Sequence, residues 1–146
     1  MRRSLLVALF VVSSVASFAA GRTSQDARPS NVGATFVSGS GMSIKVLLDA
    51  STLGASDLDI AEITFPAGSD SGDHPHGSTE TFYVLSGELE HVVNGVSTTL
   101  RPGMVGFVRP PDRVRHRTAV ETKALVIWTP GGEAARIVRN WTRRNP

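Results

Sequence analysis

Residues 68–87 read GSDSGDHPHGSTETFYVLSG, and they carry the strongest signal in the sequence. The stretch contains two of the chain's four histidines, His74 and His76, with Glu80 four residues further on. Successive side chains of a β-strand point to opposite faces, so residues an even number apart share a face. His74, His76 and Glu80 are therefore predicted to share one strand face. If that face lines a barrel, two imidazoles and a carboxylate meet in one interior volume.

Such a cluster suits a divalent metal ion. A buried carboxylate beside neutral imidazoles is costly unless it is neutralised, and a divalent cation neutralises it while it binds the nitrogen lone pairs. The alternative is that two surface histidines flank a loop by chance, because a His-x-His pattern is short. The chain has no cysteine, so nitrogen and oxygen donors are the possible ligands.

The rest of the sequence alternates short strand-like runs with Gly, Pro, Asp and Asn residues. Nine runs have this character: residues 34–39, 42–49, 58–65, 80–87, 88–93, 96–100, 104–108, 114–120 and 123–129. They predict an all-β sandwich or barrel. Asn94-Gly95 lies between two runs and favours a type I′ hairpin. After Gly131-Gly132 a short helix is possible, with Ile137 and Trp141 on one face.

Residues 1–21 have the anatomy of a secretory signal peptide, with two arginines, an apolar run and then small residues. The apolar run is too short for a bilayer and is broken by serines, so we expect removal rather than anchoring. Cleavage after Ala19 and after Gly21 are both compatible with the sequence. The mature protein is thus predicted to be secreted or periplasmic, without membrane contact.

The length of 146 residues indicates one domain, which we place at residues 34–146 after a flexible leader at residues 22–33. Without the two N-terminal arginines the chain has 13 basic and 13 acidic residues. Residues 22–100 are acidic and residues 101–146 are basic, and we expect the two halves to compensate across strands. The basic residues lack interleaved aromatics or a binding motif, which argues against nucleic acid as a partner.

The residues of the opening stretch resemble the first motif of the cupin superfamily at every fixed position. These positions are Gly68, His74, His76, Glu80 and Gly87, and the similarity continues through Gly95, Pro102-Gly103, Pro110 and His116. The resemblance covers roughly residues 57–129. It implies a single jelly-roll barrel of about nine strands that binds one divalent metal through His74, His76, Glu80 and His116. Met104 and Val120 depart from the family's common residues, but neither is a ligand position.

Three other side chains are candidates for the pocket. The alternation of side chains along its strand would place His91 on the core-facing side. There it would be a donor behind the ligands or a pocket wall. The alternative is that His91 lies on the solvent face. Phe82 and Phe107 are candidate pocket walls, with core packing as the alternative. The arginines on either side of His116 are expected to face outward and to pair with acidic neighbours.

Three imidazoles and one carboxylate leave two positions of an octahedral ion open, which is typical of a catalytic site. The donors suit Fe, Mn, Ni, Co, Cu or Zn. The resemblance implies a mononuclear, dioxygenase-like metalloenzyme that acts on a small organic substrate, with quercetinase-like dioxygenases as the nearest analogy. Glu80 is the candidate catalytic proton acceptor.

Two alternatives use the same site. One is a non-redox decarboxylase, isomerase or lyase, and the other is a cupin that binds a metal or small ligand without catalysis. We also expect a homodimer, because small barrels commonly bury exposed strand edges against a partner.

Overall fold

The computed structural model describes residues 30–144 of the chain. The predicted signal peptide and residues 22–29 of the predicted leader lie outside the described residues, so both remain predictions. Within the described part, no helix is long and apolar enough to cross a membrane.

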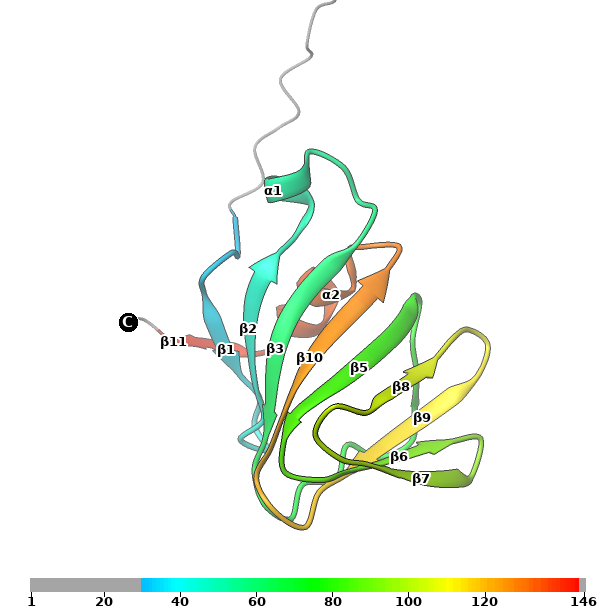
Figure 1. Cartoon of the computed structure of the whole chain (residues 1–146). Helices are drawn as coiled ribbons and strands as arrows, with labels where there is room; N and C mark the ends of the chain where they lie inside the picture. Colours follow the sequence, from blue (N-terminus) through cyan, green and yellow to red (C-terminus); the bar gives the residue numbers. More distant parts are fainter. Residues whose placement is uncertain (1–29, 145–146) are drawn as a thin grey trace, which may run out of the picture.

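Eleven strands and two short helices make up the described residues (Figure 1). The strands are β1 (Thr35–Val37), β2 (Ser43–Leu48), β3 (Asp59–Phe65), β4 (His74–Pro75), β5 (Thr79–Ser86), β6 (Leu89–Val93), β7 (Val96–Leu100), β8 (Val105–Val108), β9 (Arg113–Arg117), β10 (Thr122–Thr129) and β11 (Thr142–Arg144). The helices are α1 (Ala50–Leu53) and α2 (Glu133–Val138).

The strands form two antiparallel sheets. The larger has the order β11-β1-β2-β3-β10-β5-β8, and the smaller has the order β4-β9-β6-β7. From β3 to β10 the chain passes repeatedly from one sheet to the other, so that, apart from the β6–β7 hairpin, neighbours among these strands are not consecutive in sequence. In Figure 1 the strands β6, β7 and β9 form a layer beside β5 and β10. This is a jelly roll, and the predicted all-β class is confirmed.

Strand parity places the core between the sheets. Along β3 and β10, buried residues alternate with half-buried ones over almost the whole strand. The inward set on these two strands is Ala61, Ile63, Phe65, Ala124, Val126 and Trp128. Burial of a large apolar side chain contributes about 1.5–3 kcal/mol, so this alternation fixes which face of each strand points inward.

All nine predicted runs contain a strand, and the predicted turns are present. Asn94 and Gly95 have φ values of 48° and 84° and join β6 to β7 as a two-residue hairpin, as expected for type I′ geometry. Three short elements were not predicted: α1, β4 and β11. Two of them are strands of two and three residues, which are too short to show an alternating pattern.

The predicted C-terminal helix is α2, and it packs against the barrel. Ala134 and Val138 belong to the buried core, while Ile137 and Trp141 pack against it from the edge. The helix start is held by the buried carboxylate of Asp59 on β3, whose Oδ2 accepts hydrogen bonds from the backbone N–H groups of Gly132 (2.7 Å) and Ala134 (3.0 Å). Helix α2 is thereby tied to the large sheet next to β3.

Candidate metal centre

The fold brings all four histidines of the chain together. The ring centroids of His74 and His76 are 4.9 Å apart, those of His74 and His116 are 5.7 Å apart, and those of His91 and His116 are 5.2 Å apart. His76, His91 and His116 are buried. The interpretation of His74 and His76 as chance surface histidines is therefore wrong, because they belong to an interior cluster.

The loop between β3 and β4 positions His74 in this cluster. Between β3 and β4 the chain runs along β9, where Ser71 N donates to His116 O (3.0 Å) and His116 N donates to Ser71 Oγ (2.9 Å). Gly68 begins the loop with φ 76°, and its N–H donates to Thr118 O (2.8 Å). His74 then pairs with Val114 across β4 and β9.

The three candidate ligands of the opening stretch do not share one strand. His74 lies on β4 in the small sheet, and Glu80 lies on β5 in the large sheet. His76 lies in the connection that crosses between the sheets. The prediction that these residues share one strand face is thus wrong. Their side chains nevertheless converge as predicted, because the chain turns around the interior volume.

The carboxylate of Glu80 has two distinct oxygens. Oε1 accepts a hydrogen bond from Trp128 Nε1 at 2.9 Å, on the neighbouring strand β10. Oε2 points toward the histidines and lies 3.0 Å from His76 Nε2 and 3.8 Å from His116 Nε2. Both Oε2 and His116 Nε2 are buried without a hydrogen-bond partner, since the 3.0 Å contact lacks hydrogen-bond geometry. In the tautomer with the proton on Nδ1, His116 Nε2 is an acceptor like Glu80 Oε2, and a cation between the two atoms would satisfy both.

The ring nitrogens of His74 and His76 support the same conclusion. His74 Nδ1 lies 3.0 Å from Gly72 O, and His76 Nδ1 lies 2.8 Å from Glu133 Oε1. Both partners are acceptors, so both Nδ1 atoms carry protons and the Nε2 atoms are left for the centre. These two Nε2 atoms are 3.1 Å apart. Two neutral rings in this tautomer would direct lone pairs at each other, and a proton or metal ion between them removes the conflict.

The donor spacing fits one ion. Two ligand atoms at about 2.1 Å from a metal and at right angles to each other lie ~3 Å apart, close to the 3.0 Å and 3.1 Å contacts around His76 Nε2. Among the described residues, no group of three or more His, Asp or Glu side chains stands in ready-made coordination geometry. The donors His74, His76, Glu80 and His116 fit a metal in kind. The two contacts around His76 Nε2 also fit one in spacing, whereas Glu80 Oε2 and His116 Nε2 are farther apart, at 3.8 Å.

Burial and neighbouring charges shift the pKa values of the imidazoles in opposite directions. Desolvation, followed by the charges of the other three histidines, holds the pKa of His116 well below its usual value. Desolvation also lowers the pKa of His91. Burial alone would lower the pKa of His76, but its contacts with Glu133 and Glu80 raise it to about 9. His116 is therefore a neutral nitrogen donor, whereas a metal at His76 competes with a proton.

Glu133 is a residue of the cluster that the sequence did not reveal. It is buried at the start of α2, and its carboxylate accepts from His76 and from Arg136. Burial acts to raise its pKa, but the hydrogen bonds from His76 and Arg136 lower it to about 2. Glu80 is thus not the only carboxylate of the cluster. The one available sequence signal was an acidic residue in the first turn of the predicted helix, which ordinarily indicates no more than a favourable helix end.

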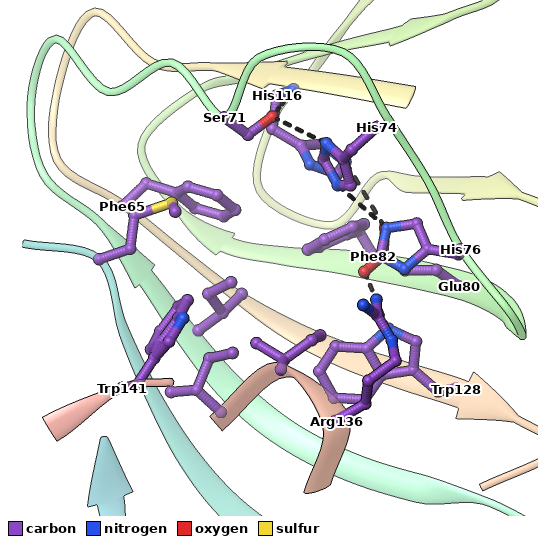
Figure 2. A pocket seen from close by; sticks show the side chains of 14 residues that line it. Phe65, Ser71, His74, His76, Glu80, Phe82, His116, Trp128, Arg136 and Trp141 are labelled. Atoms are coloured by element: carbon purple, nitrogen blue, oxygen red, sulfur yellow. Dashed lines mark hydrogen bonds and ion pairs between the residues drawn. The ribbon is translucent and has the colours of Figure 1, made fainter. Parts of the chain in front are cut away.

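A cavity of about 210 Å³ opens beside the cluster. One side carries the polar groups, and the remaining wall is apolar and aromatic (Figure 2). Its lining residues are Met42, Ile44, Ile63, Phe65, Ser71, His74, His76, Glu80, Phe82, His116, Trp128, Arg136, Ile137 and Trp141. The volume equals the space of about seven water molecules in the liquid, so the cavity suits a small molecule with an apolar body.

The three pocket candidates have different outcomes. Phe82 lines the cavity and packs edge-on against His116, with ring centroids 4.6 Å apart. His91 faces inward, as one alternative required, but it stacks behind His116 and does not line the cavity. Its Nε2 lies 3.2 Å from Phe107 O.

Phe107 is not a pocket wall. Its side chain is 53% exposed, because in β8 the residues that face inward are Gly106 and Val108. Gly106 is needed there, since a Cβ atom would lie 2.4 Å from Leu100 Cδ1 and 3.1 Å from His91 Cδ2. The predicted outward arginines are confirmed: Arg115 pairs with Asp70, and Arg117 pairs with Glu90 at 2.5 Å.

A single small jelly roll with a histidine and glutamate cluster between its sheets defines the class of protein. The sequence profile of the cupin domain family (Cupin_2) matches residues 61–130. Residues 61–130 therefore form a cupin domain, as the motif spacing predicted. A search of curated proteins gives no significant match.

Solved cupin structures share the fold at low sequence identity. An RmlC-like cupin from Shewanella frigidimarina is 22% identical and aligns over 68% of this chain and 86% of its own, with a TM-score of 0.60. A predicted oxalate decarboxylase from Thermotoga maritima is 21% identical and aligns over 71% and 97%, with a TM-score of 0.60. KdgF from Halomonas sp. is 17% identical and aligns over 64% and 83%, with a TM-score of 0.57. Because these names differ, the fold alone does not assign the reaction.

Proposed function

We propose that this cupin is a metal-dependent enzyme with dioxygenase-like activity on a small organic molecule. The observation that carries the proposal is the convergence of four donor side chains at one end of a small, mostly apolar cavity. Apolar pockets with a few convergent polar groups are the usual form of small-molecule sites. Perturbed pKa values at His76 and His116 are also typical of functional positions.

His74, His76 and His116 would bind the metal through Nε2, and Glu80 through Oε2. A divalent Fe, Mn, Ni, Co, Cu or Zn ion would supply Lewis acidity and, where it is redox-active, the capacity for dioxygen chemistry. Trp128 fixes Glu80 Oε1, so Oε2 stays directed at the centre. When the bond between Oε2 and the metal loosens, Glu80 could accept a proton from a substrate hydroxyl or carbon acid.

The apolar wall would hold the body of the substrate and exclude water. Phe65 and Phe82 flank His116, with centroid distances of 5.9 Å and 4.6 Å, and Figure 2 shows Trp141 on the opposite side of the cavity from Glu80. A dry site strengthens the electrostatic interactions inside it. The cavity size favours a compact substrate, such as a small enol, diketone or catechol.

A non-redox lyase or decarboxylase is the second candidate. The observation in its favour is the shared fold with the predicted oxalate decarboxylase from Thermotoga maritima. The same donors and the same proton acceptor would serve such a reaction. It predicts substrate consumption without oxygen uptake.

The test combines elemental analysis of the purified protein with oxygen consumption on a panel of flavonols, diketones and catechols. We expect about one transition-metal ion per chain and oxygen uptake with at least one substrate. The His116→Ala variant should lose most of the metal, whereas His91→Ala, which changes a stacked ring outside the proposed ligand set, should keep it. A His116→Ala protein with stoichiometric metal would refute the assignment, and turnover without oxygen uptake would favour the second candidate.

We also propose a homodimer and a secreted or periplasmic location. The location rests on the signal-like residues 1–21. The dimer rests on an apolar outer surface around β8, the edge strand of the large sheet among the described residues. Tyr83, Leu85, Val105 and Phe107 are exposed there, and Tyr83 pairs directly with Val105.

A further inference from the structure

The cluster receives a contact from helix α2. His76 Nδ1 lies 2.8 Å from Oε1 of Glu133, a residue 57 positions later on α2. Both side chains are buried, with 3% and 4% of their surfaces exposed. A buried hydrogen bond of this length and sequence separation ties the C-terminal helix directly to a proposed metal ligand.

The contact with Arg136 keeps the Glu133 carboxylate ionised. Glu133 therefore accepts a hydrogen bond from His76 whether or not the His76 imidazole is charged. Arg136 Nε donates to Glu133 Oε2 at 3.0 Å, and Arg136 Nη2 donates to Glu133 Oε1 at 2.5 Å. A carboxylate held by a guanidinium fork is ionised and accepts hydrogen bonds only. The hydrogen atom between Glu133 and His76 therefore belongs to His76 Nδ1.

His76 needs this support more than the other ligands. It lies in the connection between β4 and β5, where no strand pairing fixes its ring. His116, in contrast, stands on β9 and is held between Phe82 and His91, and His74 is paired through β4. Without a partner for Nδ1, the His76 imidazole could change tautomer or rotate, and Nε2 would no longer be fixed toward Glu80 and His74.

The position of Glu133 is itself fixed from the large sheet. Asp59 Oδ2 accepts hydrogen bonds from the N–H groups of Gly132 and Ala134, the two residues on either side of Glu133. Asp59 is buried on β3, so the helix start cannot shift without loss of two buried hydrogen bonds. A chain of polar contacts thus runs from the core strand through Glu133 to His76.

We propose that Glu133 is a positioning residue for the metal site: its carboxylate accepts the Nδ1–H of His76 and so presents Nε2 as the ligand atom. The inference rests on the proposed metal site, but the Glu133–His76 hydrogen bond exists without it and is measurable separately. Loss of a hydrogen-bonding partner behind a metal ligand typically weakens metal affinity 10- to 100-fold, and we expect a loss of about this size here.

The experiment measures two quantities on the full chain. The first is the NMR signal of the His76 Nδ1–H proton, in the metal-free protein and with Zn²⁺. The second is the Zn²⁺ dissociation constant by competition with a chelator. The variants are Glu133→Ala, Glu133→Gln and Val138→Ala. Gln keeps an acceptor oxygen of similar shape, and Val138→Ala weakens the packing of α2 without a polar contact to the site.

We expect Glu133→Ala to lose the protected Nδ1–H signal and to weaken Zn²⁺ binding ~10- to 100-fold. Glu133→Gln should restore both in large part, and Val138→Ala should leave both near wild-type values. The proposal is overturned if Glu133→Ala keeps the signal and the affinity, if Gln fails to rescue, or if Val138→Ala causes an equal loss. A wild-type protein that binds no Zn²⁺ or other transition metal would refute the proposed metal site, while its Nδ1–H signal would still test the Glu133 contact.

Discussion

Gly68 and Gly87 bracket the opening stretch, and the structure predicts very different costs for replacing them by alanine. Both have left-handed backbones, with φ values of 76° and 78°. A Cβ atom at Gly68 would meet nothing within 4 Å. A Cβ atom at Gly87 would lie 2.4 Å from Glu121 O and 2.5 Å from Thr122 Oγ1. The two variants share a conformational cost and differ in the steric one.

The magnitudes follow from these contacts. A left-handed conformation costs an alanine about 1–2 kcal/mol, so Gly68→Ala should lower the free energy of unfolding by about that amount. Gly87→Ala adds an overlap with backbone that cannot move freely, because Thr122 Oγ1 also accepts from Glu88 N at 3.0 Å and donates to Glu88 O at 2.9 Å. Overpacking of this kind costs about 1–3 kcal/mol more.

Urea unfolding of the chelator-treated protein measures the difference without a contribution from metal. We expect both variants to keep the wild-type slope and Gly87→Ala to have the lower midpoint, by an amount that corresponds to about 1–3 kcal/mol beyond Gly68→Ala. Equal midpoints for the two variants would refute the reasoning, because they would show that the close approach of β5 to residues 121–122 does not constrain this position.

Three further predictions address the site and the surface. Trp128→Phe leaves Glu80 Oε1 without its hydrogen-bond donor. Loss of that hydrogen bond should destabilise the metal-free protein by about 1–3 kcal/mol, more than Trp141→Phe does. Equal unfolding midpoints for the two variants would show that the hydrogen bond contributes nothing to stability. When free metal is present at 100 times its dissociation constant, its removal by a chelator should lower the unfolding midpoint of the wild type by the equivalent of ~2.7 kcal/mol. The same treatment should leave the unfolding midpoint of His116→Ala unchanged. Phe107→Asp should convert the proposed dimer to a monomer in light scattering, and a wild type that is monomeric at high concentration would exclude the dimer.

Periodicity in the sequence was sufficient to predict the strands and the sheet class. Runs such as residues 58–65 and 123–129 alternate between core and outer face, and a one-residue slip would expose the whole apolar set. The turns at Asn94-Gly95 and Gly87 were predictable because their positive φ values favour particular residues. Local sequence patterns were therefore sufficient to predict the strands that line the interior.

The connection at residues 74–79 was not predictable from parity. Even spacing looks the same for one continuous strand and for a chain that crosses between two sheets, as it does between His74 and Glu80. Phe107 was misassigned for a related reason, since parity in β8 is set by the small residue Gly106 that makes room for His91. Glu133 was missed because its partner His76 is 57 residues away, and no local pattern encodes that contact.

The boundary of the family match divides the residues around the cavity into two groups. Residues 61–130 contain His74, His76, Glu80 and His116, so the shared domain supplies the whole donor set. Half of the other residues that line the cavity come from segments outside the match: Met42 and Ile44 before it, and Arg136, Ile137 and Trp141 after it. The proposed metal ligands therefore lie within the shared domain, whereas part of the cavity wall lies in the segments before and after it. Helix α2 serves both groups, because the same turn that contributes Arg136 to the wall contributes Glu133 to His76.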